Sequence, residues 1–217
     1  MKTRATTEKP PSAGQRTRSA ILEHAVDLAS VEGLEGLAIG PLASALQMSK
    51  SGLFAHFGSK EELQLATIEA ARERFINEVF LPSLERKRGL TRLTALSDAW
   101  ISYAERKVFR GGCFFVAASA EFDSKPGPVR NRIAAVMGEW LGALERAVTL
   151  AQESGELDPA VEPSQLAFEL NALFMGANWA FQLHRDKSAF VHARVAIEAR
   201  LGGLELRPKL RVMRKRG

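Results

Sequence analysis

The sequence predicts an all-α fold of about nine helices, with an amino-terminal helix-turn-helix domain followed by a larger helical domain. Apolar residues recur three and four positions apart along most of the chain, as they do on one face of a helix. Glycines, prolines and capping serines separate these segments, and none shows the sustained apolar-polar alternation that strands require. The 217 residues, 46% hydrophobic and 25% charged, suit a globular chain of one or two domains.

The amino-terminal region begins without periodicity and then becomes helical. Residues 1–15 are rich in Thr, Pro, Ser, Ala and Gly, so we expect a flexible arm. A helix should run from Arg16 to the stop at Gly33, because apolar residues fall at helical spacing between them. A second, short helix is expected from Pro41, whose fixed φ suits a first helical position, through Leu46.

A tight turn and two capping serines follow. Residues 47–49 form the turn, and Ser49 can cap a third helix over Lys50–Phe57. Ser59, with Glu three residues later, predicts a capping box that opens a long fourth helix toward Phe80. Two short helices joined by a tight turn are typical of a helix-turn-helix unit.

The remaining chain is expected to be helical between breaks rich in glycine and proline. The predicted breaks are Pro82, Gly89, Gly111-Gly112, 125–128, 155–163 and 185–188. The expected organisation is a basic arm at 1–15, a helix-turn-helix domain at 16–62, a larger helical domain at 63–203 and a basic tail at 204–217.

The formal charge of +5 is concentrated at the two ends of the chain. Residues 1–18 carry a net charge of +4 and residues 204–217 a net charge of +5, so the body between them is acidic. A basic end next to a folded domain indicates either a polyanionic partner, nucleic acid or an acidic membrane surface, or a solvated tail without a partner. A single cysteine excludes an intrachain disulfide and favours a reducing cytosol, and neither a secretory signal nor a membrane span is visible.

The segment 163–184 is apolar on two sides of its predicted helix. One stripe contains Leu166, Leu170, Leu173, Ala177 and Ala180, and the other contains Phe168, Ala172, Met175, Trp179 and Leu183. Such a helix needs a cover on both faces. We expect a homodimer through residues 163–201, in which Phe190, Ala193, Ile197 and Leu201 join the interface; the alternative is a fully buried central helix of a monomer.

Residues 16–63, above all the run from Gln47 to Leu63, resemble the DNA-binding domain of the TetR family of bacterial transcriptional regulators. In the family pattern the recognition helix ends in an aromatic residue, two variable positions and Phe. A small residue, Ser-Lys and an acidic pair then open the next helix, as Gly58 to Glu62 do here. The resemblance implies an all-helical homodimer that binds a palindromic operator through its amino-terminal domains. It also implies that the variable carboxy-terminal domain, here residues 63–203, binds a small ligand and dimerises.

Within this resemblance, a recognition helix presents its amino-terminal residues to base edges while neighbouring helix starts hold phosphates. Gly52 would let the backbone approach DNA, and Leu53 and Phe57 should face the core. Phe54 replaces the usual Tyr and loses one phosphate hydrogen bond, and His56 is either a phosphate donor or a bystander. The candidate DNA-binding residues are Arg18, Ser49, Lys50, Ser51, Gly52, Phe54, His56 and Lys60.

The larger domain contains many aromatic residues on its central helices. The candidate ligand-binding residues are Trp100, Tyr103, Phe115, Phe122, Met137, Trp140, Phe174 and Asn178. Apolar walls with a few polar groups, such as Tyr103, Asn171 and Asn178, would suit a hydrophobic or aromatic small molecule. The alternative for each aromatic residue is an ordinary place in the core.

Enzymatic and metal-binding functions have weaker support. The apolar flank of Cys113 favours an inert thiol over a nucleophile or redox sensor, and His184, Asp186 and His192 have the spacing of a surface cluster rather than a metal site. We therefore assign no catalytic residue, metal or cofactor. The sequence predicts a cytoplasmic, ligand-responsive, sequence-specific DNA-binding regulator, a repressor. The alternative is a helical small-molecule or metal-binding protein whose helix-turn-helix does not read DNA.

Overall fold

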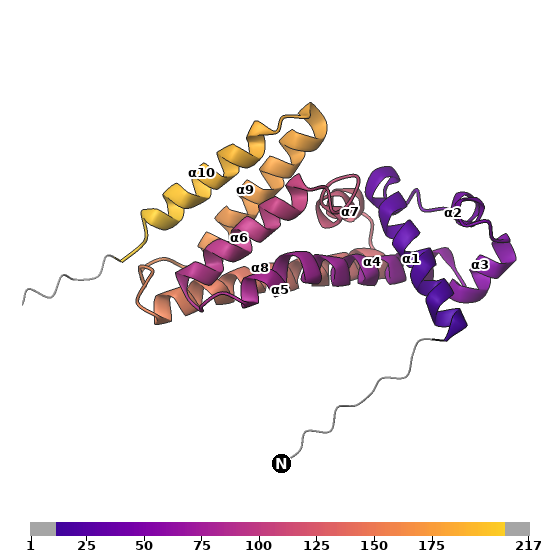
Figure 1. Cartoon of the computed structure of the whole chain (residues 1–217), viewed down its shortest axis with the longest axis horizontal. Coiled ribbons are helices and arrows are strands. Elements are labelled where there is room, and N and C mark those ends of the chain that lie inside the picture. Colours follow the sequence, from indigo (N-terminus) through magenta and orange to yellow (C-terminus); the bar gives the residue numbers. More distant parts are fainter. Residues whose placement is uncertain (1–11, 207–217) are drawn as a thin grey trace, which may run out of the picture.

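The computed structural model describes residues 12–206, and this part of the chain is all-α, as predicted (Figure 1). It has ten α-helices and one π-helical segment, and one isolated bridge joins Leu157 and Glu205. The elements are α1 (Ala13–Glu32), α2 (Ile39–Ala45), α3 (Lys50–Phe57), α4 (Lys60–Phe75), η1 (Ile76–Phe80), α5 (Leu81–Leu84), α6 (Leu90–Glu105), α7 (Phe114–Phe122), α8 (Pro128–Glu153), α9 (Pro163–His184) and α10 (Ser188–Gly202). Because α4, η1 and α5 follow one another without a break, the described residues form nine helical stretches.

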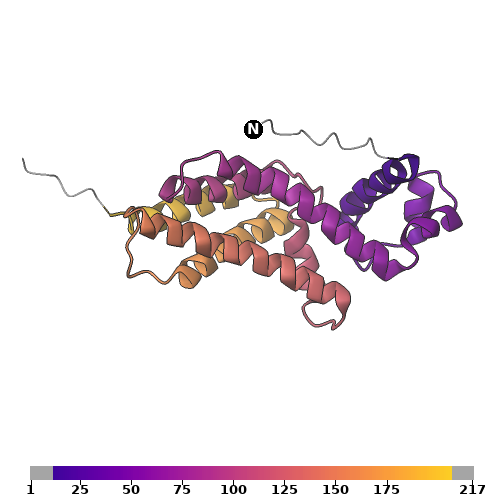
Figure 2. The ribbon, with the colours of Figure 1, turned by 90° about the horizontal axis from the view of Figure 1, so that it is seen from below.

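Helices α1 to α3 form a small unit at one end of the molecule, and α4 connects it to the larger domain (Figures 1 and 2). Their apolar faces meet in a core that contains Ile21, Leu42 and Leu53. Figure 2 shows the long helix α8 crossing the larger domain, with α9 and α10 at the end remote from α3. The helix-turn-helix and the proposed dimer helices therefore lie at opposite ends of the subunit.

The first two helices begin earlier than the sequence predicted. The Ser12 side chain accepts a hydrogen bond from Gln15 N, and the Gln15 side chain accepts one from Ser12 N. This reciprocal cap starts α1 at Ala13, so the expectation of a non-helical arm reaching residue 15 is wrong. Pro41 lies in the first turn of α2 rather than at its first position, which is tolerated because the N–H groups there have no intrahelical partner.

The predicted helix break at Pro82 is wrong, because the helix continues to Leu84. The preceding turn widens into the π-helical segment η1, and Leu81 N–H bonds to Ile76 O. An α-helical turn would bring the proline ring against the carbonyl four residues earlier, and a wider turn avoids that clash. The other predicted breaks separate helices as expected.

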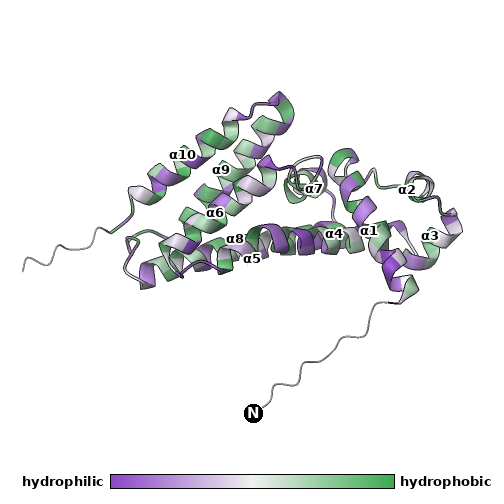
Figure 3. Ribbon diagram, in the orientation of Figure 1, coloured by the Kyte–Doolittle hydropathy of each residue, from purple (hydrophilic) through white to green (hydrophobic). Residues whose placement is uncertain are grey.

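Helix α9 is apolar on two sides, and only one side is buried within the subunit. Hydrophobic positions recur along the α9 ribbon (Figure 3). Leu166 and Leu170 are fully buried, whereas Phe168, Trp179 and Leu183 are 65%, 58% and 62% exposed. The stripe expected to extend this surface on α10 is wrong: Phe190, Ala193, Ile197 and Leu201 are buried. They pack into the subunit core, and the exposed apolar residues of α10 are instead Val191 and Val195.

Residues 1–11 and 207–217 lie outside the described part of the chain. Most of the predicted arm and of the predicted tail falls there, including nearly all of the terminal positive charge. Between residues 12 and 206, no helix combines the length and the hydropathy needed to cross a membrane.

Candidate nucleic-acid interface and ligand cavity

Helix α3 is held at its start by a side-chain cap and along one face by the core. Gln47 has a φ of 54° and reverses the chain after α2, and Ser49 Oγ then accepts from Gly52 N at 3.0 Å. Leu53 and Phe57 are buried, as expected for residues four apart on one face. These contacts present the opposite face of α3 at the outer edge of the small domain (Figure 1).

The leading end of α3 carries the residues expected to meet DNA. Lys50, Ser51 and Phe54 are exposed. The Lys50 side chain lies over the start of α2, since a Cβ atom at Gly40 would be 3.4 Å from its Cε and 3.7 Å from its Nζ. A Cβ atom at Gly52 would lie 3.1 Å from Ser49 Oγ. Glycine at position 52 thus leaves room for the cap, a role that the sequence did not suggest.

Three further candidates surround this helix. The Arg18 guanidinium lies 5.0 Å from the centre of the Phe57 ring, which holds it beside the end of α3. His56 is half-buried on α3. Lys60 Nζ donates to Glu35 O at 2.7 Å and pairs with Glu35 Oε1 at 3.2 Å, so a phosphate would have to compete with this pair.

Helix α7 joins the small domain to the larger one. The Glu121 carboxylate accepts from Leu34 N at 2.7 Å and from Glu35 N at 2.9 Å, just after α1 ends. The loop before α7 adds a second contact, from Gly111 N to Ser30 Oγ at 3.1 Å. A Cβ atom at Gly111 would lie 1.6 Å from Ser30 O, so only glycine permits this approach.

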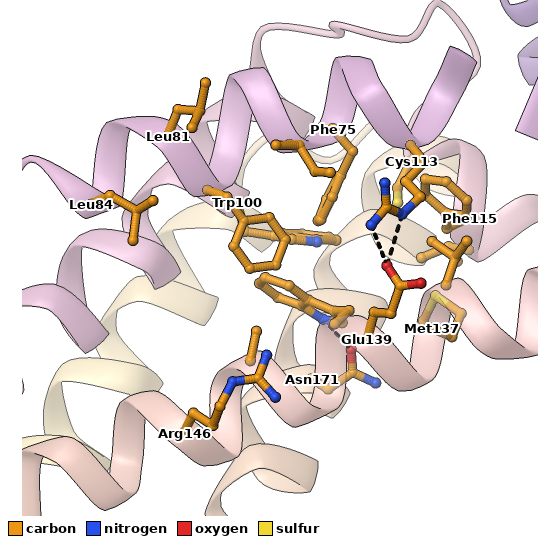
Figure 4. A pocket seen from close by; sticks show the side chains of 17 residues that line it. Phe75, Leu81, Leu84, Trp100, Cys113, Phe115, Met137, Glu139, Arg146 and Asn171 are labelled. Carbon is orange, nitrogen blue, oxygen red and sulfur yellow. Dashed lines mark hydrogen bonds and ion pairs between the residues drawn. The ribbon is translucent and has the colours of Figure 1, made fainter. Parts of the chain in front are cut away.

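A cavity of about 490 Å³ opens in the larger domain between the stretch formed by α4, η1 and α5 and the helices α6 to α9 (Figure 4). Its volume lies within the range of small-molecule sites. Its lining comprises Arg72, Phe75, Ile76, Phe80, Leu81, Leu84, Trp100, Cys113, Phe115, Val116, Val136, Met137, Glu139, Trp140, Ala143, Arg146 and Asn171. Helix α4 therefore leads directly from this cavity to α3.

Four of the eight candidate ligand residues line the cavity: Trp100, Phe115, Met137 and Trp140. The other four, Tyr103, Phe122, Phe174 and Asn178, are buried outside its lining. Phe174 stacks on Trp100 with ring centres 4.8 Å apart, and Asn178 Oδ1 accepts from Cys113 N at 2.9 Å. Phe174 and Asn178 therefore contact residues that line the cavity without lining it themselves.

The wall formed by α4, η1 and α5 was missed because the candidate ligand-binding residues were taken only from the later helices, from Trp100 onward. Apolar side chains at Phe75, Phe80 and Leu84 recur at four- and five-residue spacing along it and form one side of the cavity. The available signal was Pro82 beside this apolar run. A proline inside a helix can force a wide turn, and wide helical turns occur often at functional sites.

The charged groups of the cavity form a network with one exception. Arg72 Nε donates to Glu139 Oε2 at 2.7 Å, and Arg132 contacts both Glu139 and Glu69. The hydrogen bond from Arg132 holds the pKa of Glu69 below its usual value. Arg146 lines the cavity without an ion pair or hydrogen bond to any of residues 12–206.

Burial and hydrogen bonding disfavour catalysis or metal binding by the groups considered for these roles. Burial raises the pKa of the Cys113 thiol and raises that of Tyr103 well above its usual value, so both stay neutral. Asp186 accepts from Ser188 N at 2.8 Å and Ser188 Oγ at 2.6 Å at the start of α10. Across the described range, no three His, Cys, Asp or Glu side chains are placed to hold a metal ion.

Comparison with known proteins agrees with this geometry. Residues 21–67 match the family model for bacterial regulatory proteins of the tetR family, and residues 89–197 match the model for the tetracyclin repressor-like carboxy-terminal domain. The chain is similar to the HTH-type transcriptional regulator TcmR of Streptomyces glaucescens, with 29% identity over 205 residues that cover 90% of this chain and 85% of TcmR.

Solved structures show the same architecture. A TetR transcriptional regulator from Chloroflexus aurantiacus superposes with a TM-score of 0.84 and 29% identity, covering 89% of this chain and 98% of that one. AibR, in complex with isovaleryl coenzyme A and operator DNA, superposes with a TM-score of 0.65 and 24% identity, covering 86% and 97% of the two chains. With both of its regions matched to the family, the chain belongs to the TetR family of bacterial transcriptional regulators.

Proposed function

We propose that this regulator binds a palindromic operator as a homodimer and represses transcription until a small molecule occupies the cavity. The observation that carries the proposal is the presentation of α3: Ser49 caps its start, Leu53 and Phe57 anchor it, and Lys50 and Ser51 remain exposed. A helix held in this way can enter a major groove with its leading end toward the bases.

A dimer through α9 and α10 is supported by the exposed apolar residues on both helices. Phe168, Trp179 and Leu183 on α9 and Val191 and Val195 on α10 are each more than half exposed in the subunit. An apolar surface of this kind is typical of an interface. The two copies of α3 would have to lie about 34–36 Å apart to enter successive major grooves.

Control by a ligand requires that it bind one arrangement of the domains more tightly than the other. Three structural links join the cavity to the small domain: α4, the Gly111–Ser30 contact and the Glu121 carboxylate. AibR, which shares this fold, was solved in complex with isovaleryl coenzyme A and operator DNA, and this supports a protein of this fold that binds both a small molecule and an operator.

We infer that the cavity binds its ligand without transforming it. Among the described residues that line it, the one carboxylate, Glu139, is bonded to Arg72 and Arg132, and the one thiol, that of Cys113, has a raised pKa. Neither is prepared for general-base or nucleophilic chemistry. Since its target is chromosomal DNA, we place the protein in the cytoplasm.

The direct test is a mobility-shift titration with the DNA upstream of the protein's own gene. We expect retardation at low salt that weakens steeply as salt rises, because phosphate contacts release counterions. The variants K50A and H56A should each bind about tenfold more weakly, and K87A, which removes an exposed lysine far from α3, should bind as the unchanged protein does. Normal affinity in both α3 variants would contradict the assignment of the recognition helix, and no retardation at low salt would favour a small-molecule-binding protein that does not read DNA.

A further inference from the structure

We propose that the cavity takes a planar aromatic molecule that carries an anionic group, with the rings among Phe75, Phe80 and Trp140 and the anion at Arg146. The inference rests on the proposed role of the cavity as a ligand site and names the class of ligand. Two independent features carry it: the arrangement of the aromatic walls and the distribution of charge around them.

The aromatic walls form a set of perpendicular ring contacts. Phe75 meets Trp140 with ring centres 5.3 Å apart and planes at 87°, and Phe80 meets Trp140 at 5.6 Å and 88°. Trp140 is fixed because its Nε1 donates to Asn171 Oδ1 at 3.0 Å. The remaining faces and edges of these rings can contact a flat aromatic ligand, which would either stack on a ring or pack edge to face against it.

The charges of the cavity lie on either side of these rings. Figure 4 shows Glu139 on one side of the aromatic side chains and Arg146 on the other, and Arg72 pairs with Glu139 at 2.7 Å. Glu139 and Arg146 are two turns apart on α8, or about 10 Å along its axis. The Arg146 side chain turns back along the helix, since a Cβ atom at Gly142 would lie 3.2 Å from its Nη1.

This charge distribution favours an anion over a cation. Aromatic rings can bind a cation by their faces, but Glu139, the carboxylate of the cavity wall, is already paired with Arg72 and Arg132. A cationic ligand would gain no free counter-charge and would meet Arg146. A carboxylate or phenolate would instead complete the hydrogen bonding of the Arg146 guanidinium, which suits planar oxygen pairs.

The test is calorimetric titration of the full-length protein with four probes. Anthraquinone-2-carboxylate has the rings and the anion, 2-(hydroxymethyl)anthraquinone is its neutral counterpart, proflavine is a flat cation, and dodecanoate is an anion without rings. We expect the anthraquinone carboxylate to bind about tenfold more tightly than any other probe. Equal or tighter binding of another probe, or no binding of the carboxylate, would overturn the assigned class.

The anion position is tested with R146Q, matched by R130Q on the same helix. Arg146 and Arg130 are both exposed, and glutamine suits a helix, so both variants should fold. R146Q should weaken binding of the carboxylate about tenfold and leave the neutral alcohol unchanged, while R130Q changes neither. Unchanged carboxylate binding by R146Q, or equal losses for both probes, would overturn the role of Arg146.

Mobility shifts on the same samples separate this inference from the proposed function. Retarded DNA together with a failed probe ranking would refute the ligand class alone. The expected ranking without any retardation of DNA would refute the regulatory function alone.

Discussion

Replacing Glu121 with alanine should destabilise the junction between the DNA-binding domain and the ligand domain. Its carboxylate accepts two backbone hydrogen bonds, from Leu34 N and Glu35 N, where the chain leaves α1. The same helix, α7, lines the cavity with Phe115 near its start. Glu121 therefore connects the far end of a cavity-lining helix to the small domain.

The expected loss follows from the burial of the two donors. Leu34 is buried, so its N–H would be left without water, and a hydrogen bond to a charged group contributes about 1.5–3 kcal/mol. Glu35 is exposed, and water can replace the carboxylate there at a cost of about 0.5 kcal/mol. E121A should thus lower the free energy of unfolding by about 2–3 kcal/mol, and E121Q, which keeps an acceptor oxygen, by about half as much.

Equilibrium unfolding in urea, followed by helical circular dichroism, measures this difference. The matched control is E153A, which removes an exposed glutamate that has no ion pair within the described residues and should change stability by less than about 0.5 kcal/mol. If E121A unfolded at the same urea concentration as E153A, the two hydrogen bonds would not hold the domains together and the reasoning would fail.

Three further predictions concern the dimer surface and the buried polar groups. W179E, with K87E as an exposed charge-reversing control outside α9 and α10, should convert the dimer to a monomer in sedimentation experiments; a dimer that persisted would exclude α9 from the interface. The Tyr103 hydroxyl lies beside the Cys113 thiol without a hydrogen bond of normal geometry, so Y103F should keep or raise the melting temperature, and a clear decrease would show that the hydroxyl is stabilising. Burial raises the pKa of Cys113, so the folded state keeps a neutral thiol where the unfolded chain ionises. Stability should therefore fall as the pH rises above the ordinary pKa of cysteine, and C113A should reduce that slope.

Local signals in the sequence were sufficient for the helix-turn-helix. The serines at 49 and 59 cap α3 and α4 because a side-chain oxygen acts only on backbone groups two or three residues away. The buried pair Leu53 and Phe57 follows from helical periodicity alone. The early start of α1 was missed although its signal was equally local, since Ser12 and Gln15 are three residues apart.

The ligand cavity could be predicted only in part. Trp100, Phe115, Met137 and Trp140 belong to its lining, but aromatic residues of the core and of a cavity look alike in a sequence. Whether Phe174 faces ligand space or supports Trp100 depends on how α6 and α9 cross, which no local pattern specifies. The burial of the apolar stripe on α10 also depends on how the helices pack. The prediction assigned this stripe to the dimer interface, whereas the structure buries it in the core of the subunit.

Local sequence patterns were sufficient for the helical class, the helix-turn-helix with its caps and the two apolar faces of α9, because each depends on residues within about one or two turns of one another. The tertiary structure was needed to show that Glu121 reaches Leu34, that the helix continues through Pro82 along the cavity, and that Glu139 is paired while Arg146 has no ion pair or hydrogen bond with any of residues 12–206. The helix passes Pro82 because the turn before it widens into η1. The contacts of Glu121 and Glu139 join residues far apart in the chain, so their geometry is set by the packing of whole helices rather than by local preference.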